Sequence, residues 1–505
     1  MPAGAAPGQA DNKQQVASTT ERKAPMEPHL ALFPAGRESS AARFPGRARR
    51  NHVAIELDRE CNPARPGARA KSYRMSAMDG GHCHKILKIS APVLLAVLAS
   101  VFFARVAVPS AEQLSSGYLS YYVAAQALRS GEPGKRLYDD HWFAQRALRL
   151  SNGRITDIYL ANPPTVAVAW LPFSYLSVHG ARKAWVAISV AFLGISFWLI
   201  AVELAWTAAP WLLTGMCAIF LLGAPTREQF HTGQMYALIL LLHVIGWRAY
   251  VRQRYSTTGL AVGLAMVLKI SGWPICLLMV GQRRWSALGW AAGTAAAVAL
   301  LTLPWVGVEA WRALLLQAIP RTLRWGAATL TAYQDTTGFW QHLFRYDTAL
   351  NPHPLIDAPV IATLLTLATT AGACYALLKS RRAAGITFAA AVALTELLSP
   401  AAEQYHYVVL LLPLAVLCQA AWARRSVALG AIALVATYLI TGPIDYKTVH
   451  PAWEILRNYP RLAGGWILFV TLLMPQRAEP APDTDAARTQ TRTEPMSTAR
   501  EPSVS

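Results

Sequence analysis

The chain has 505 residues, of which 54 % are hydrophobic and only 15 % are charged, and its mean hydropathy is +0.27. Uncharged runs such as 186–202 and 287–305 are long enough to cross a hydrocarbon layer of about 30 Å as helices. Backbone polar groups inside lipid must be satisfied within the segment itself, so these runs should be helical. The composition excludes an ordinary soluble domain and predicts an all-α, polytopic membrane helix bundle.

The formal net charge of +19 does not indicate a nucleic-acid partner, because of where the basic residues lie. They form short clusters between apolar runs, which is typical of cytoplasmic loops in membrane proteins. These clusters are Arg252/Arg254, Arg283/Arg284, Lys379/Arg381/Arg382 and Arg424/Arg425. We expect a protein of the bacterial inner (plasma) membrane, surrounded by lipid and without bound nucleic acid.

Both ends of the chain lack sustained periodicity. Residues 1–85 are interpreted as a disordered basic tail or, upstream of Met75 or Met78, as a mis-assigned start. Residues 475–505 are predicted to be a second disordered tail, and 86–474 a single transmembrane domain. His82-Cys83-His84 is a poor metal site because three adjacent residues cannot easily surround a tetrahedral ion.

The first span is predicted at 86–108, after which a polar and aromatic loop, 109–183, emerges on the outer side. In this loop 118–128 and 142–148 have helical spacing, separated by a breaker at 131–134. The apolar stretch after Pro163-Pro164 is expected to be a juxtamembrane or re-entrant helix. Counting it as a full span would make the later basic clusters inconsistent with the charge bias.

The same charge bias predicts about twelve crossings in total, with both termini inside and a second outer loop at 307–355. Two of the crossings are short halves that meet at 269–274, and such broken helices are tolerated only where they are buried or line a cavity. The spans after the first are predicted at 184–206, 209–224, 235–251, 258–269, 272–280, 286–306, 356–378, 384–399, 407–423, 427–442 and 463–474.

This topology brings several polar segments to the same outer face. They are the loop 109–183, the turn 225–234, the break at Lys269, the loop 307–355 and the turn 400–406. Binding and chemistry concentrate on loops held by a rigid scaffold. The sequence therefore predicts one extracytoplasmic site built from these segments.

Lys269 is the clearest single candidate, because a charge in an apolar helix pair is costly and is a functional-site hypothesis by default. It could meet a lipid phosphate, or it could be a lysine that snorkels to the interface. The turn 226–234 could supply Arg227 to a phosphate and hydrogen bonds to a sugar, or be a solvated turn. Near Ser399-Pro400, the residues 396–407 offer carboxylates, an imidazole and aromatic rings, which stack on sugars or mark an interface.

Four acidic residues of the first outer loop could act as a general base, or could be solvated carboxylates. They are Glu112, Asp139, Asp140 and Asp157. The sequence contains no P-loop, no dinucleotide-binding turn, no G-x-S-x-G elbow and no H-E-x-x-H motif. We therefore expect no nucleotide chemistry and no cofactor, while a divalent-metal requirement is left open.

Several short motifs follow one another in an informative order. They are Tyr118-Leu119-Ser120-Tyr121-Tyr122 with Gly131 and Leu137-Tyr138-Asp139, Asn162-Pro163-Pro164 with Leu171-Pro172, Gly233-Gln234, the run 259–269 with Pro274, Tyr333-Gln334 with Gly338-Phe339, and Ser399-Pro400 with His406. Over roughly 86–474 this order resembles glycosyltransferase family 87, whose members are polyprenyl-phosphate-mannose-dependent hexosyltransferases.

The resemblance implies a GT-C fold with its active site on the extracytoplasmic side and a lipid-linked sugar donor. It also implies an acidic base in the first outer loop and basic residues at the donor phosphate, a position that Lys269 matches. On this basis we predict that the donor is bound by Lys269, Arg227, Gln234, Tyr122, Asn162, Gln334 and His406.

The chain departs from the family pattern at Gly117, where the family usually has Asp. Either another carboxylate has taken over, or activity is altered or lost. The local alternatives, which we predict as catalytic candidates, are Glu112, Asp139, Asp140, Glu228 and Glu403.

Three functions are compatible with these features. The first is transfer of a mannose-like hexose from a polyprenyl phosphate to an envelope glycan or glycolipid. The second is a non-catalytic transporter or flippase of a lipid-linked sugar, which Gly117 and the broken helices favour. The third is an oligosaccharide ligase or polymerase. Formation of a new glycosidic bond separates the first from the second.

Overall fold

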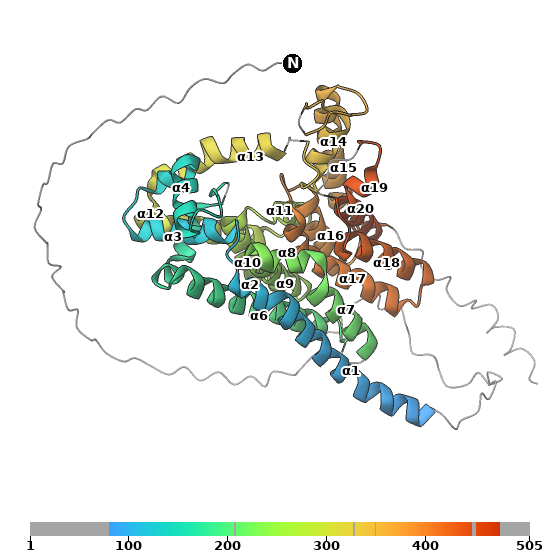
Figure 1. Ribbon diagram of the computed structural model, residues 1–505. Helices are drawn as coiled ribbons and strands as arrows, with labels where there is room; N and C mark the ends of the chain where they lie inside the picture. The colour runs from blue at the N-terminus through green and yellow to red at the C-terminus, as the bar shows by residue number, and fades with distance from the viewer. Residues whose placement is uncertain are drawn as a thin grey trace, which may run out of the picture. The chain divides into compact units, whose positions relative to one another are not determined.

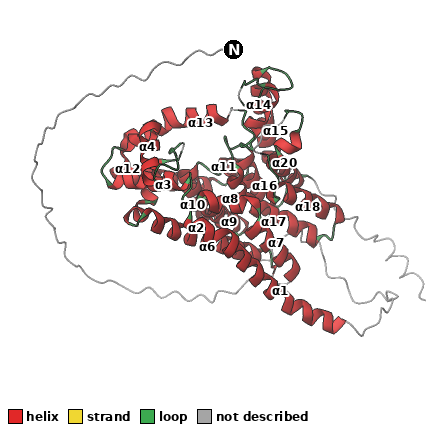
Figure 2. Cartoon of the chain, viewed as in Figure 1, coloured by secondary structure: helices red, strands yellow, loops and turns green. Residues whose placement is uncertain are grey.

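The computed structural model describes residues 80–160, 162–206, 209–326, 329–348, 350–446 and 451–474, without the side chains of 80–89, 325 and 326. Within these residues every regular element is a helix and no strand is present (Figures 1 and 2). The predicted all-α class is therefore confirmed. Most of both predicted tails, and the side chains of His82, Cys83 and His84, lie outside this description.

Each of the twelve runs predicted as spans coincides with a helix. They are α1 (Gly80–Phe102), α6 (Val178–Glu203), α7 (Pro210–Leu222), α9 (Tyr236–Val251), α10 (Tyr255–Lys269), α11 (Trp273–Gly281), α12 (Trp285–Ala313), α15 (Pro359–Lys379), α16 (Ala384–Leu397), α17 (Leu411–Ala423), α18 (Val427–Thr441) and α20 (Pro460–Leu473).

By length and composition alone, five helical segments of the described chain could cross a membrane by themselves. They are Ser90–Glu112, Val178–Glu203, Trp285–Arg324, Pro359–Lys379 and Gln404–Ala423. Shorter apolar helices accompany them, including α9, α16, α18 and α20. The chain is thus a polytopic helical membrane protein, and the number of its crossings stays a prediction.

The first predicted outer loop is largely helical. As expected, two amphipathic stretches form helices on either side of the glycine-rich breaker. The elements are α2 (Val108–Glu112), α3 (Tyr118–Arg129), the 3-10 turn η2 (Gly134–Tyr138), α4 (Asp140–Leu150), α5 (Pro164–Ala169) and the 3-10 turn η3 (Leu171–Tyr175). The apolar stretch after Pro163 is divided between α5 and η3, and neither is long enough to span a bilayer.

The second predicted outer loop also has helical structure. The helix α12 is kinked at Gly307, one residue after the predicted end of its span, and continues through the π turn η5 (Leu314–Ala318) into α13 (Ile319–Gly326). In Figure 1, α13 runs from the neighbourhood of α4 toward α14 (Thr336–Phe344). An ion pair of 2.5 Å between Arg321 and Asp140 joins α13 to α4.

Two glycines allow α10 to pack closely against α12. A Cβ atom at Gly259 would lie 2.3 Å from the carbonyl oxygen of Ala287, and one at Gly263 would lie 2.5 Å from that of Ala291. Small residues four apart are the usual means by which membrane helices approach closely. The Gly259/Gly263 pair therefore fixes α10, and with it Lys269 at its end.

The predicted break between α10 and α11 is confirmed. Ile270 has a φ of 53° and Gly272 a φ of 103°, so the chain leaves the helical conformation directly after Lys269. A new helix begins at Trp273, with Pro274 in its first turn, where a missing N–H is harmless.

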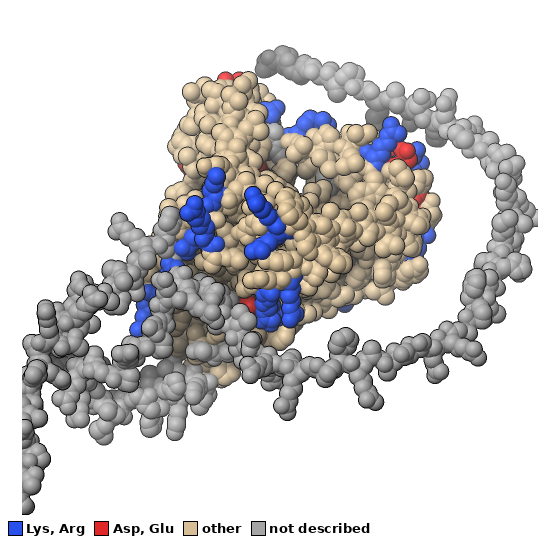
Figure 3. Space-filling view, turned by 180° about the vertical axis from the view of Figure 1, so that it is seen from behind, with Lys and Arg blue, Asp and Glu red and all other residues tan. Residues whose placement is uncertain are grey.

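The helices α9, α16 and α17 contribute many of the buried apolar side chains of the core. The side chains of α16 are buried on nearly all sides, as expected for a helix that is apolar all round and lies within a bundle. Much of the surface visible in Figure 3 is uncharged, and its basic side chains gather in a few groups. One buried carboxylate, Glu203, pairs with both Arg248 and Arg252 at 2.7 Å.

Candidate active site

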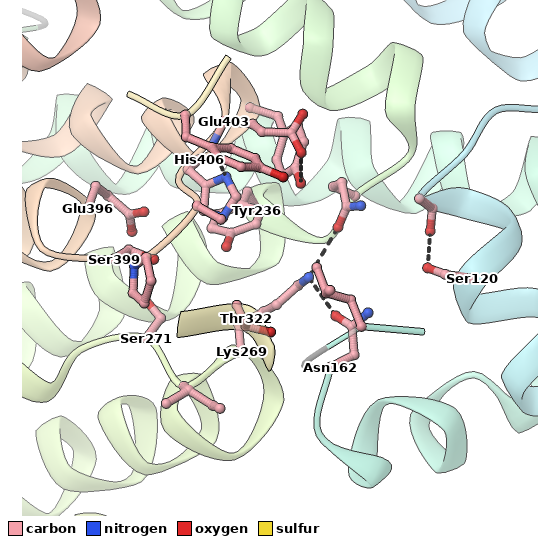
Figure 4. Close-up of a pocket in the computed structure, with 18 of the residues that line it drawn as sticks. Ser120, Asn162, Tyr236, Lys269, Ser271, Thr322, Glu396, Ser399, Glu403 and His406 are labelled. Carbon is pink, nitrogen blue, oxygen red and sulfur yellow. Dashed lines mark hydrogen bonds between the residues drawn. The ribbon is translucent and has the colours of Figure 1, made fainter. Parts of the chain in front are cut away.

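A cavity of about 540 Å³ lies where the polar ends of several helices meet (Figure 4). Its lining comes from the segments 116–120, 157–162, 232–236, 269–273, 319–323, 333 and 395–406. All five segments that the sequence predicted to share one face contribute to it. The structure therefore brings together segments that are up to 290 residues apart, from 116 to 406.

Lys269 lies at the centre of this cavity. Its Nζ donates to Asn162 Oδ1 at 2.7 Å and to Gln234 Oε1 at 3.1 Å. The same ammonium group lies 5.2 Å and 5.4 Å from the ring centroids of Tyr121 and Tyr236. Among the described residues no carboxylate reaches it within the 4.0 Å of an ion pair. Its direct partners are neutral, so its positive charge is available to an anionic ligand.

The two amides that hold Lys269 are themselves fixed. Asn162 Nδ2 donates to the carbonyl of Tyr159 at 2.6 Å, and the carbonyl of Asn162 accepts from the Tyr138 hydroxyl at 2.8 Å. The Gln234 side-chain oxygen also accepts from the Tyr121 hydroxyl. These contacts place the ammonium before any ligand arrives, which is the preorganisation that electrostatic catalysis requires.

Three carboxylates line the cavity on either side of Lys269. Glu396 belongs to the last turn of α16, is 1 % exposed, and its Oε1 has no hydrogen-bond partner among the described residues. Glu403 precedes the 3-10 turn η6 (Gln404–Leu410) and forms a capping box with His406. In Figure 4, Lys269 separates the side that carries Glu396 and Glu403 from the side that carries Ser120.

The third carboxylate, Asp157, lies on the Ser120 side. Its Oδ2 accepts from the backbone N–H groups of Gly117 at 2.6 Å and Ser120 at 2.9 Å, and its Oδ1 accepts from that of Ile158 at 3.0 Å. Burial raises the pKa of this carboxyl to about 6, against the opposing effect of these three hydrogen bonds. Asp157 is thus held firmly and titrates nearer to neutrality than an ordinary aspartate.

Aromatic rings form one wall of the cavity. The His406 ring lies 4.3 Å from that of Tyr236 and 4.6 Å from that of Tyr405, measured between centroids. His406 Nδ1 accepts from the backbone N–H of Glu403 at 3.0 Å, so a neutral imidazole would present its Nε2–H as a donor. Such a wall can stack on a sugar and donate a hydrogen bond to it.

The opposite rim is apolar. It consists of Ile270 and Trp273 at the helix break, and of Ile319 and Leu323 from α13. Ile270 is 39 % and Leu323 54 % exposed, so this rim opens away from the packed core. The cavity therefore combines a half-buried cation and acidic groups with an apolar opening, which suits a ligand that has a charged head and a lipid tail.

Comparisons of the sequence with known proteins point to one family. The sequence profile of glycosyltransferase family 87 matches residues 159–400, which carry most of the cavity lining. The chain is thus similar to glycosyltransferase family 87 over these 242 of its 505 residues. No solved structure matches it.

Two mycobacterial relatives carry the name "polyprenol-phosphate-mannose-dependent alpha-(1-2)-phosphatidylinositol mannoside mannosyltransferase". The protein of Mycolicibacterium smegmatis is 28 % identical over 351 residues, which are 63 % of this chain and 76 % of the relative. The protein of Mycobacterium tuberculosis is 27 % identical over 304 residues, which are 57 % of this chain and 69 % of the relative.

Five of the residues predicted for the site line the central cavity. They are Lys269, Gln234, Asn162, His406 and Glu403. Their roles remain predictions. Their common feature is position, since each lies at or next to the end of a helix that points toward the cavity.

Three predicted catalytic carboxylates lie elsewhere in the chain. Glu112 forms an exposed ion pair of 3.0 Å with Lys183. Asp139 caps α4 by accepting from the N–H of Trp142 and lines a separate cavity. Asp140 is held by Arg321 of α13. None of the three lines the central cavity, and their catalytic role stays a prediction.

Four further predicted residues are also outside the central cavity. Arg227 and Glu228 lie on α8 (Ala224–Thr232) and line a separate polar cavity. The Tyr122 hydroxyl donates to the carbonyl of Leu176. Gln334 is fully buried, and its Nε2 donates to the carbonyls of Thr331 and Asn458. Tyr122 and Gln334 thus hold backbone segments together around the site.

Tyr121 and Tyr236 both lie close to Lys269, but neither was among the predicted site residues, although Tyr121 belongs to one of the motifs. Asp157 was one of four loop acids, but it was not among the proposed substitutes for the missing aspartate. Closeness to predicted site residues in the chain was the one signal present in the sequence. Asp157 precedes Asn162 by five positions, and Tyr236 follows Gln234 by two.

Proposed function

We propose that this protein transfers a mannose-like hexose from a polyprenyl phosphate to an envelope glycan or glycolipid. The transfer takes place on the extracytoplasmic side of a bacterial inner membrane. The observation that carries the proposal is Lys269, a lysine with neutral partners at a helix break inside the cavity. The names of the two relatives support a mannose donor and a glycolipid acceptor.

In the proposed reaction the acceptor hydroxyl oxygen forms a bond with the anomeric carbon of the donor sugar. The bond from that carbon to the phosphate oxygen breaks, and the electron pair leaves with the polyprenyl phosphate. A carboxylate of the cavity accepts the hydroxyl proton. Negative charge develops on the leaving phosphate, where the Lys269 ammonium stabilises it. The lipid-linked sugar brings its own leaving group, so the proposal requires no organic cofactor.

The apolar rim gives the donor its orientation. With the phosphate at Lys269, the polyprenyl chain would leave past Ile270 and Leu323 toward lipid, and the sugar would lie in the polar part of the cavity. In this arrangement the anomeric carbon would lie between Lys269 and a carboxylate of the cavity.

The test is transfer of labelled mannose in membranes supplied with polyprenyl-phosphomannose. Lys269→Met should lower turnover by about 10²-fold or more, the usual loss when a preorganised donor to a developing oxyanion is removed. Lys269→Arg, which keeps the charge, should retain a measurable part of the activity. Full activity in Lys269→Met would contradict the proposal.

A transporter of lipid-linked sugar is the second candidate, because the broken α10–α11 pair is also a transporter feature. Proteoliposomes containing the purified protein separate the two functions. A transporter would move labelled lipid-linked sugar across the bilayer without forming a glycosidic bond, whereas a transferase would need acceptor and would release polyprenyl phosphate.

A further inference from the structure

The observed backbone at position 117 disfavours a side chain. Gly117 has a φ of 83°, which L side chains rarely adopt, and a Cβ atom there would lie 2.4 Å from Gln234 Nε2. Gln234 in turn holds Lys269. A carboxylate at position 117 would therefore displace the residue that places the cation, so the acidic group of this chain has to come from another segment.

The carboxylate of Asp157 reaches this same point from a different part of the loop. Its Oδ2 lies 2.6 Å from the backbone nitrogen of Gly117, and both residues line the cavity beside Ser120. The family match begins at residue 159 and contains neither Gly117 nor Asp157. This part of the site is consequently built from residues outside the region that the chain shares with the family profile.

The segment that carries Asp157 is rigidly held. The Ser151 hydroxyl contacts the backbone of Ile155 in both directions, accepting from its N–H at 2.9 Å and donating to its carbonyl at 3.1 Å. The buried Tyr159 donates to the carbonyl of Pro163 at 2.8 Å and accepts from the N–H of Ala167 at 3.0 Å. Such support keeps a carboxylate in one position, as a general base requires.

The carboxylate also keeps acceptor capacity toward the cavity. An ionised carboxylate offers about four lone-pair sites, and backbone N–H groups occupy three of those on Asp157. Glu403, in contrast, is committed to the capping box with His406, and Glu396 is 1 % exposed. Of the three carboxylates, Asp157 is the one best placed to receive a proton from a hydroxyl entering beside Gly117.

We propose that Asp157 is the general base of this chain and substitutes for the aspartate that the family resemblance puts at position 117. This inference rests on the proposed transferase function. The acceptor hydroxyl would donate its proton to an Asp157 oxygen while its own oxygen bonds to the anomeric carbon. The phosphate leaves with the electron pair at Lys269, on the side of the sugar away from Asp157.

A purely structural role for Asp157 is the competing explanation, because the same carboxylate caps the first turn of α3. The experiment must therefore measure something that loss of a cap does not change. Asp157→Asn keeps an oxygen for the two α3 contacts but cannot accept a proton. Asp157→Ala leaves space for formate, a small carboxylate that can replace a missing base without rebuilding the loop.

Both variants, made in the full chain, are assayed with polyprenyl-phosphomannose and a glycolipid acceptor, beside wild type. We expect Asp157→Asn to lower turnover by about 10²-fold to 10⁴-fold, the usual contribution of a general base. Its KM for the donor should change little, and its Tm should stay within about 2 °C of wild type. Formate should restore part of the turnover of Asp157→Ala.

Asp357→Asn is the matched control for loss of a loop carboxylate. Asp357 is exposed and accepts from the N–H of Tyr346 at 3.1 Å, which repeats the backbone contact of Asp157 away from the cavity. We expect wild-type turnover in this variant, with or without formate.

Several outcomes would overturn the inference while the transferase function stands. One is turnover of Asp157→Asn within about twofold of wild type, far below the loss that a missing base produces. Another is loss of turnover that parallels a fall in Tm and does not respond to formate. Formate rescue of Glu403→Ala in place of Asp157→Ala would assign the base to Glu403. If wild type itself forms no mannosidic bond, the proposed function fails, and the role of Asp157 fails with it.

Discussion

Lys269 and its amide partners show how a single residue can decide whether the cavity accepts an anion. Gln234 Oε1 accepts from both Lys269 and Tyr121, while among the described residues no acceptor is recorded for its Nε2. Gln234→Glu would keep both contacts and convert the neutral partner into a carboxylate. The lysine would then be neutralised by the protein before a phosphate could bind.

We therefore expect Gln234→Glu to raise the KM for the donor by about tenfold or more, which corresponds to about 1.4 kcal/mol. Its Tm should not fall, because an ion pair replaces a neutral hydrogen bond. Gln234→Met, which removes the acceptor without adding charge, should raise the KM less. Purified variants compared by donor titration and thermal unfolding test this. A wild-type KM in Gln234→Glu would show that the phosphate is bound elsewhere.

The pKa of Asp157 leads to a second prediction at this scale. Burial raises it from 3.8 to about 6, opposed by the three backbone hydrogen bonds, and Lys269, Glu403 and Tyr121 face it across the cavity. A base acts in its ionised form. Turnover should thus fall about tenfold per pH unit below about pH 6, whereas turnover that depends on an ordinary aspartate would decline only near pH 4.

The pH profile of kcat/KM from pH 4.5 to 8 tests this, with Asp157→Asn as the comparison. The residual activity of that variant should lack the decline near pH 6. A decline that persists unchanged in Asp157→Asn would have to come from another group, of which Glu403 is the nearest alternative in the cavity.

How far the sequence could predict the site depends on the kind of residue. Lys269 could be recognised because a lysine in an apolar run is unusual wherever the chain folds. Asp157 could not be selected from the four loop acids, because its position depends on the contact between residue 157 and the start of α3. Tyr122 and Gln334 were predicted because they belong to the family motifs. Their side chains bind backbone carbonyls and do not line the cavity.

At the scale of elements, long apolar runs fix helix positions well, while connections between them are harder to foresee. The kink at Gly307 falls next to the predicted end of a span, and the break at 269–274 appears where Gly272 and Pro274 indicated it. The helix α13 was predicted only as part of a loop, because its residues follow the apolar run from which the preceding span was predicted. Its pairing with α4 through Arg321 and Asp140 needs the tertiary structure.

The close approach of α10 and α12 gives a prediction for an element. In Gly263→Val the new side chain would meet the Ala291 carbonyl, so α10 would have to move away from α12. Overpacking of this kind costs about 1–3 kcal/mol. Since α10 carries Lys269, donor binding should weaken together with the Tm.

Gly293→Val, in α12, is the matched control, because no atom lies within 4 Å of a Cβ at that position. We expect both its Tm and its donor KM to remain close to wild type. Equal behaviour of the two variants in thermal unfolding would contradict the close packing between α10 and α12.

At the scale of the whole molecule, several helices connect the cavity with a basic cluster. The helix α9 begins at the cavity residue Tyr236 and ends just before Arg252, and α10 returns from Arg254 to Lys269. The segment Gln404–Ala423 begins beside the cavity and ends just before Arg424 and Arg425. At 1.5 Å per residue its 20 residues extend over about 30 Å, the thickness of a hydrocarbon core.

This arrangement predicts the sidedness of the site. Basic clusters favour the cytoplasm, so the cavity at the other ends of these helices should face the extracytoplasmic side. The test uses a background in which all six cysteines are replaced by alanine, with one cysteine introduced at Arg154 or at Arg425, both of which are exposed. Arg154 lies in the loop that carries Asp157, and Arg425 follows α17.

A membrane-impermeant maleimide added to intact cells should label Arg154→Cys and spare Arg425→Cys, and permeabilisation should make both react. Labelling in the reverse order would place the cavity in the cytoplasm. The donor would then have to present its sugar on the cytoplasmic leaflet, and an envelope acceptor would be out of reach of Lys269. The topology thus decides which acceptors the chemistry can use, independently of the residues that perform it.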